Sequence, residues 1–350
     1  MKALKFFISL VIGGVCLWLA FRGAASGQEG TGLSWREISA GIAAMPWWSH
    51  AGFAVLMVLQ ALVRTERWRV QVRGFTGTAP SWRDSLAING VAYAAVFLMP
   101  FRLGEFVRPN LSAQRGIMRA SAGLAASALE RILDGIVTTG IFGVVLFWLG
   151  DRELPAWVRA GGVSALLVFG SAVLCLSIAF RYRAATAELV RRVLGRFHAR
   201  LAERLTSMLL GFFDGLGCFK RPVDLVAYLG LSIAFWLLNG LGMLVLLRGL
   251  VPDVQLVDAF FCMCFLVIGV MLPAPPGNVG NFHAFARKSL TILGIAHGPA
   301  VAYAVLLHAW STLGVVLWAM IFLLRRDVTL AGVRAAAHAS QTPDGPAGAA

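Results

Sequence analysis

Long runs of apolar residues alternate with short polar segments along most of the chain. A run of about 20 apolar residues is long enough to cross the hydrocarbon core of a bilayer as a helix. Eight such runs can be recognised, two of them short: 3–22, 42–63, 85–101, 129–149, 161–180, 225–247, 257–272 and 300–324. The pattern predicts an all-α polytopic membrane protein.

The first run follows Lys2 and Lys5, a pattern that is also typical of a signal peptide. The run is rather long for a signal peptide, and Arg22 interrupts the small residues that follow it. These two features favour an uncleaved first helix with a cytoplasmic N-terminus.

Basic residues in the connecting segments indicate which of them face the cytoplasm. Segments 64–83 and 181–222 are rich in arginine, and Arg325 with Arg326 follows the last run, so both termini are expected inside. If all eight runs crossed the membrane, the four arginines of segment 102–119 would lie outside. We therefore expect about six full spans and two re-entrant helical hairpins of opposite orientation, at the positions 84–118 and 255–296. The alternative is that both breaks are loops at the membrane surfaces.

Each expected hairpin breaks at a Pro-x-x-x-Gly sequence, Pro100–Gly104 and Pro273–Gly277. Proline removes a backbone donor and clashes with the preceding helical turn. Broken backbone at membrane depth is tolerated where protein or a water-filled cavity satisfies its polar groups. Interrupted segments at corresponding positions of two inverted halves point to a transporter site near the bilayer midplane.

Residues 1–326 are expected to form one transmembrane domain. Within it, segment 181–222 has an apolar and an arginine-rich face, which indicates either an interfacial helix on an anionic leaflet or a solvated linker held by protein. The remainder, 327–350, is rich in Ala, Gly and Pro and is expected to be a largely disordered cytoplasmic tail.

Composition supports this class: 58% of residues are hydrophobic, 14% are charged, and the mean hydropathy is +0.75. Soluble domains carry about 25% charged residues. The net charge of +14 fits cytoplasmic loops against the anionic leaflet of an inner membrane. No nucleic-acid motif, nucleotide-binding loop, nucleophile elbow or metal-ligand spacing occurs. We therefore expect membrane lipids as partners, no nucleic acid, no cofactor, no metal and no catalytic residues.

Three charged residues, Glu130, Arg131 and Asp134, fall at the start of an apolar run. A charge at the bilayer centre costs on the order of 3 kcal/mol on insertion scales, so such groups usually face the protein interior and pair. Glu130 and Asp134 are four residues apart and share one helix face. They indicate either an ion or proton site or a structural salt bridge, with Arg102 or Arg108 as partner.

The residues around the two breaks are the candidates for substrate binding. Arginines match phosphate oxygens well, although ordinary interfacial anchoring is the alternative. At the second break, glycines permit close backbone approach, and a half-helix starting near Asn281, capped by Asn278 or Asn281, attracts an anion. The candidates are Arg102, Gly104, Glu105, Arg108, Pro273, Pro276, Gly277, Asn278, Gly280, Asn281 and His283.

Arg67, Trp68 and Arg69 follow the second apolar run. Arginine and tryptophan are typical of the membrane–water interface. We interpret these three residues as a cytoplasmic anchor, with lipid headgroup contact as a second role.

Taken together, four motifs resemble the transmembrane region of the lysylphosphatidylglycerol synthase family, also called flippase-like proteins. They are Arg67-Trp68-Arg69, Met99–Glu105, Glu130–Asp134 and Pro273–Gly280, in the order in which the family carries them. Many members have a Glu where this chain has Asn281 and His283. The aminoacyl-transferring members also have a soluble domain, so this chain is expected to correspond to the flippase part.

The resemblance implies translocation of a lipid, such as a phospholipid, a polyprenyl-linked glycan or a hopanoid-type lipid. The alternative is an integral-membrane enzyme, or an accessory subunit of a lipid-modification or envelope glycan pathway. Further partners would be a second copy of the chain or enzymes of the pathway.

Overall fold

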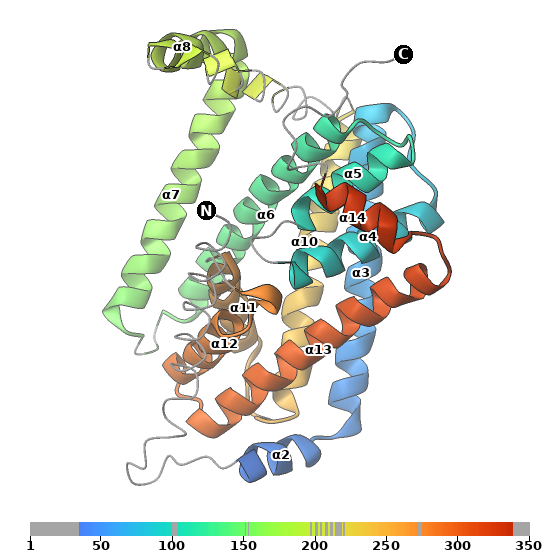
Figure 1. The fold of residues 1–350 in the computed structure, drawn as a ribbon. Helices are drawn as coiled ribbons and strands as arrows, with labels where there is room; N and C mark the ends of the chain where they lie inside the picture. Colours follow the sequence, from blue (N-terminus) through green and yellow to red (C-terminus); the bar gives the residue numbers. More distant parts are fainter. Residues whose placement is uncertain are drawn as a thin grey trace.

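The computed structural model describes residues 35–99, 104–196 apart from 151 and 153, 221–271 and 275–338, with isolated residues between 198 and 219. The first apolar run, 3–22, lies outside these residues. The described part of the chain is helical and contains no strands (Figure 1). Three helices are long and apolar enough to cross a membrane: α6 (Ala120–Trp148), α10 (Pro222–Arg248) and α13 (His297–Leu324).

The other helices differ widely in length. They are α2 (Trp35–Ala43), α3 (Trp47–Thr76), α4 (Trp82–Leu98), α5 (Val107–Gln114), α7 (Ala156–Arg181), α8 (Arg183–Gly195), α11 (Leu256–Met271), α12 (Asn281–Ile292) and α14 (Leu330–His338), with a 3-10 turn η2 at Pro276–Asn278.

Helices α3 and α10 form the antiparallel pair on which the bundle is built. Near the start of α3, a Cβ on Gly52 would lie 2.8 Å from Val245, close to the end of α10. Near the end of α3, Arg73 pairs with Asp224 in the first turn of α10, with 2.5 Å between Nη2 and Oδ1. Small residues let the two backbones approach closely, as is common between membrane helices.

Two helical hairpins enter the bundle from opposite ends. The hairpin of α4 and α5 begins after the end of α3, and that of α11 and α12 begins after the end of α10. Because α3 and α10 are antiparallel, these starting points lie at opposite ends of the bundle (Figure 1). The structure thus contains the opposed hairpins that the loop charges predicted.

The turning points of the two hairpins meet inside the bundle. A Cβ on Gly277, in the second break, would lie 3.9 Å from Phe97, near the end of α4. His308 of α13 packs on Phe97, with ring centroids 5.8 Å apart, and its Nε2 lies 2.7 Å from the carbonyl oxygen of Gly277. The imidazole therefore satisfies a carbonyl that the broken helix leaves without an intrahelical donor.

Two helix boundaries differ from the sequence prediction. Helix α3 continues to Thr76, although the apolar run ends at residue 63, and α6 begins at Ala120 rather than near 129. The α3 extension carries Arg64, Glu66, Arg67, Arg69 and Arg73, and the α6 extension is rich in Ala, Ser and Gly, so both are less hydrophobic than the runs that they extend. Hydropathy marks where a helix meets hydrocarbon, and it does not mark where the helix ends.

The outer segments are arranged around this core. Helix α7 runs along the edge of the bundle and leads to α8 at its end (Figure 1). The tail is helical from Leu330 to His338, which differs from the expectation of a largely disordered tail. The reason is that Val328, Val333 and Ala336 are buried in a cluster with residues of α4 and α5. Residues beyond 338 lie outside the described part of the chain.

The turn into α5 should depend on the absence of a side chain at Gly104, whose Cβ would overlap the backbone of Ala95 and Val96. We expect Gly104→Ala to destabilise the protein by about 2 kcal/mol, as overpacking typically does. The measurement is the midpoint of thermal unfolding in detergent. The control is Gly140→Ala in α6, where a Cβ meets nothing within 4 Å. Equal midpoints for the two variants would contradict the close approach.

Candidate functional site

A buried cluster of four charges lies where α3, α5 and α6 meet. The Arg67 guanidinium pairs with Glu130, at 2.6 Å from Nη2 to Oε1, and with Asp134, at 2.5 Å from Nη1 to Oδ1. Arg108 of α5 pairs with the second oxygen of Glu130, at 2.5 Å from Nη2 to Oε2, and donates to Ser127 Oγ at 3.1 Å. Two cations thus balance two anions.

Neighbouring side chains from α10 complete the cluster. Trp236 donates its Nε1–H to Asp134 Oδ1 at 3.1 Å. The guanidinium carbon of Arg67 lies 5.7 Å from the ring centroid of Tyr228 and 5.0 Å from that of Phe235. Because buried charges are tolerated when they are paired and hydrogen-bonded, this shell accounts for an arginine that is only 1% exposed.

The interfacial role expected for Arg67 and Trp68 is therefore wrong. Both side chains are buried, at 1% and 2% exposure, because α3 continues as a helix inside the bundle. Arg67 faces the carboxylates of α6, and Trp68 packs in a cluster with residues of α4 and α5. Arg69 lies nearer the surface, where it pairs with Glu66 and packs on Trp82 at 4.6 Å. Among the expected partners of Glu130, the structure places Arg108 in contact, while Arg102 lies outside the described residues.

A central cavity of about 530 Å³ lies beside the charge cluster. Its walls come from α3, α4, α6, α10, α11, α12 and α13, together with Pro275 and Asn278 of the second break, so it lies where the two hairpins meet. Most of the lining is apolar. The polar or charged side chains, including the aromatic Tyr93 and Trp236, are Gln60, Arg64, Tyr93, Arg131, Asp134, Trp236, Asn239, Asn278 and Ser311.

Arg64 is the cation of this cavity whose charge no carboxylate neutralises. Its guanidinium carbon lies 3.2 Å from the ring centroid of Tyr93 and 4.8 Å from that of Phe235. No hydrogen bond or ion pair joins it to another described residue, and its buried Nε and the nearby Gln60 Nε2 lack partners there. The other cavity arginine, Arg131, lies 3.7 Å from Glu105, measured from Nε to Oε1. The cavity therefore holds an excess of hydrogen-bond donors and positive charge.

The structure distributes the candidates around the first break over three roles. Gly104 permits the close turn against α4, and Glu105 pairs with Arg131. Arg108 is held in the charge cluster and does not line the central cavity. Arg102 lies outside the described residues.

The candidates around the second break lie together at the tip of its hairpin. Pro276, Gly277 and Asn278 form η2, and the left-handed φ values of 73° and 54° at Gly277 and Asn278 suit glycine and asparagine. Asn278 lines the cavity, whereas Gly277 is buried beneath it. Pro273 lies outside the described residues.

Helix α12 begins at Asn281, as expected, but its cap differs from the prediction. The N-cap is Gly280, at φ 94°, and not Asn278 or Asn281. His283 Nδ1 accepts a hydrogen bond from the Gly280 N–H at 3.5 Å, so this imidazole occupies the donor that an anion would use. Its ring centroid lies 4.6 Å from that of His308.

Several cavity or cluster residues are not among the candidates that the sequence indicates, notably Gln60, Arg64, Tyr93 and Trp236. Arg64 directly follows the apolar run and was counted as a loop charge. A signal for it existed, because Gln60, Arg64 and Arg67 recur at three- and four-residue spacing and so share one helix face. Among the described residues, no group of His, Cys, Asp or Glu side chains is arranged to hold a metal ion.

Removing Glu130 should be costly, because it leaves two buried guanidinium groups without their shared partner. We expect Glu130→Gln to destabilise the protein by about 3 kcal/mol, measured by thermal unfolding in detergent. The control is Glu188→Gln, since Glu188 is exposed on α8 and its ion pairs are surface pairs. A Glu130→Gln variant as stable as the control would show that the cluster does not hold the helices together.

Comparisons with known proteins agree with this architecture. The chain is 27% identical to a protein described as glycosyltransferase AglD of Haloferax volcanii over 289 residues, which cover 74% of this chain. The match spans 46% of that relative's length. No solved structure matches the chain. The model of the lysylphosphatidylglycerol synthase TM region matches residues 6–319, which confirms the resemblance seen in the four motifs. This membrane protein therefore belongs to the lysylphosphatidylglycerol synthase transmembrane-region family.

Proposed function

We propose that this protein transports a lipid with a phosphate-bearing, anionic headgroup across the inner membrane. The observation that carries the proposal is Arg64, whose guanidinium lines a largely apolar cavity and pairs with no carboxylate in the described part of the chain. An isolated buried charge is unfavourable unless a ligand neutralises it. A phosphate fits this requirement, because the guanidinium fork matches its oxygens.

The walls of the cavity also suit a transported molecule. They are contributed by two hairpins that enter from opposite ends and by the helices that surround them. In transporters with inverted repeats, a site between two such halves is exposed to each side in turn by rocking one half against the other. The apolar lining favours a lipid over a small polar solute.

The buried charge cluster serves this function indirectly. Its two arginines and two carboxylates are mutually paired, so they leave no net charge for a ligand. We assign Arg67, Arg108, Glu130 and Asp134 to holding the helices in register around the cavity. Proton transfer through Glu130 or Asp134 is the second role that the sequence left open.

Orientation follows from the distribution of arginines. The end of the bundle that holds the end of α3, the start of α4 and the end of α13 carries Arg73, Arg83, Arg325 and Arg326. By the positive-inside rule, we place this end, the start of the chain and the tail in the cytoplasm.

A second candidate is a role inside an envelope glycan pathway, as a membrane enzyme or as a subunit of one. It is favoured by the similarity to a Haloferax volcanii protein that is described as a glycosyltransferase. The two candidates meet if the transported lipid is a polyprenyl phosphate that carries a sugar. Lipid movement in vesicles that contain only this protein would separate a transporter from an enzyme subunit.

The transport proposal predicts a specific loss in Arg64→Gln. In proteoliposomes with a leaflet-resolved assay, we expect this variant to move fluorescent phosphatidylglycerol or polyprenyl phosphate at least tenfold more slowly than wild type, with partial recovery in Arg64→Lys. The control is Arg73→Gln on the same helix, because Arg73 is half exposed and pairs with Asp224. Rates in wild type equal to those in empty vesicles for both lipids would overturn the proposal.

Stability should change in the opposite direction from activity at this position. Arg64→Met removes a charge that no carboxylate among the described residues pairs with. We therefore expect the free energy of unfolding to stay equal to that of wild type or to rise by up to about 1 kcal/mol. Arg67→Met, one turn further along α3, should instead destabilise it by about 3 kcal/mol, because it leaves Glu130 and Asp134 unpaired. Thermal unfolding in detergent tests both. A large destabilisation in Arg64→Met would mean that Arg64 is structural.

A further inference from the structure

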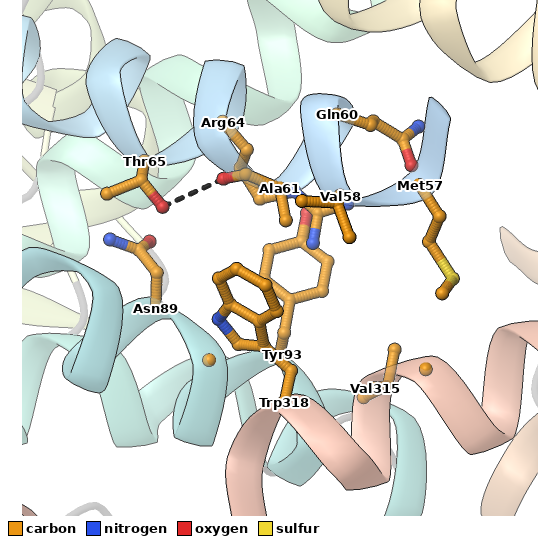
Figure 2. Close-up of a pocket in the computed structure, with 12 residues that line it drawn as sticks. Met57, Val58, Gln60, Ala61, Arg64, Thr65, Asn89, Tyr93, Val315 and Trp318 are labelled. Carbon is orange, nitrogen blue, oxygen red and sulfur yellow. Dashed lines mark hydrogen bonds between the residues drawn. The ribbon is translucent and has the colours of Figure 1, made fainter. Parts of the chain in front are cut away.

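A second, smaller pocket of about 80 Å³ lies between α3, α4 and α13 (Figure 2). Helix α3 contributes Met57, Val58, Gln60, Ala61, Arg64 and Thr65 to its lining. The lining also includes Asn89 and Tyr93 of α4 and Val315 and Trp318 of α13. We call this pocket the side slot.

The side slot adjoins the central cavity. Both are lined by the same five side chains, Met57, Gln60, Arg64, Tyr93 and Val315. Arg64 therefore lies between the two spaces and lines both. A ligand held at Arg64 has the slot within reach of its next few atoms.

The outer mouth of the slot opens on an apolar surface. Val58 lines it and is 42% exposed. Directly beside lining residues in the sequence, α3 and α13 carry further exposed apolar side chains, namely Leu59, Leu313 and Leu317. In a membrane protein such a surface lies against the hydrocarbon chains of lipids.

Two glycines allow large side chains to pack close to the backbone in the slot, which makes the slot narrow. A Cβ on Gly90 would overlap Trp318, and a Cβ on Gly314 would overlap Met57. Trp318 and Met57 thus rest directly on bare backbone. Met57 lines both the slot and the cavity, and methionine is an unbranched, flexible side chain that adapts to its surroundings.

We propose that the side slot is a lateral doorway, through which the hydrocarbon chain of the bound lipid reaches the bilayer while its headgroup remains at Arg64. The proposal rests on the transport function proposed above. The occupant is a single hydrocarbon chain, because the slot is narrow, mainly apolar and directed at the lipid-facing surface. Met57 is the side chain that moves aside to admit it.

A competing exit leads from the central cavity past Met271. Met271, at the end of α11, also lines the central cavity and is 62% exposed. A chain leaving there would pass the tip of the second hairpin instead of the gap between α3 and α13. The two exits involve different helices, so labelling can distinguish them.

The first test blocks the mouth of the doorway with a larger side chain. In proteoliposomes we expect Val58→Trp to slow the movement of phosphatidylglycerol and undecaprenyl phosphate at least tenfold. Val55→Trp is the matched control, because Val55 is an exposed valine on the same helix that lines neither pocket. A second plug, Ala61→Phe, acts from inside the slot. If wild type moves lipid and both plugged variants match Val55→Trp, the doorway is overturned while the transport function stands.

The second test uses the unmodified protein and so does not depend on the folding of variants. Phosphatidylglycerol and undecaprenyl phosphate probes carrying a diazirine in the chain are photoactivated in vesicles, and labelled peptides are identified by mass spectrometry. Labels on Val58, Ala61 or Trp318, which line the slot and not the central cavity, support the doorway, whereas labels confined to the region of Met271 overturn it. If neither probe moves and neither labels the slot, the transport function and the doorway both fail.

Discussion

The guanidinium of Arg67 lies between the carboxylates of Glu130 and Asp134, and the arrangement of α3, α5, α6 and α10 depends on that contact. Between helices in a bilayer the hydrophobic effect contributes little, because lipid tails are as apolar as the side chains. Polar contacts and close packing then decide how helices align. A charge moved out of this cluster would be left in an apolar environment, so sliding or rotating one helix against the others is costly.

The same helix carries a contrasting arginine one turn earlier. Arg67 is fully paired, while Arg64 contacts aromatic rings and leaves its charge to the cavity. The carboxylates of the charge cluster are already paired with Arg67 and Arg108, so they form no ion pair with Arg64. Stability and ligand attraction are thus divided between neighbouring positions of α3. A rigid cluster next to an unsatisfied cation is the arrangement that a binding site requires, since the scaffold keeps the cation in place.

The opposed hairpins explain why a cavity exists inside the bundle. Each hairpin turns inside the bundle, so neither fills the full length that a spanning helix would fill. Where the tips meet, Gly277 is held by Phe97 and His308, and the remaining space is lined by the surrounding helices. The glycines and prolines of the two breaks contribute mainly by permitting these turns. The polar and charged groups that face the cavity come largely from the unbroken helices α3, α6 and α10.

By itself, the sequence determined the all-helical membrane class, the two interrupted hairpins, their opposite entry and the need to pair Glu130 and Asp134. These features follow from local quantities: hydropathy, proline and glycine positions, loop charge and the four-residue spacing on a helix. Tertiary structure alone decided which arginine pairs with those carboxylates and which one remains for a ligand. Arg64, Arg67 and Arg108 have the same side chain, and only the rotation and register of α3 and α5 against α6 assign them different partners. That assignment depends on contacts between residues more than 60 positions apart, such as Arg67 and Glu130, which no local pattern records.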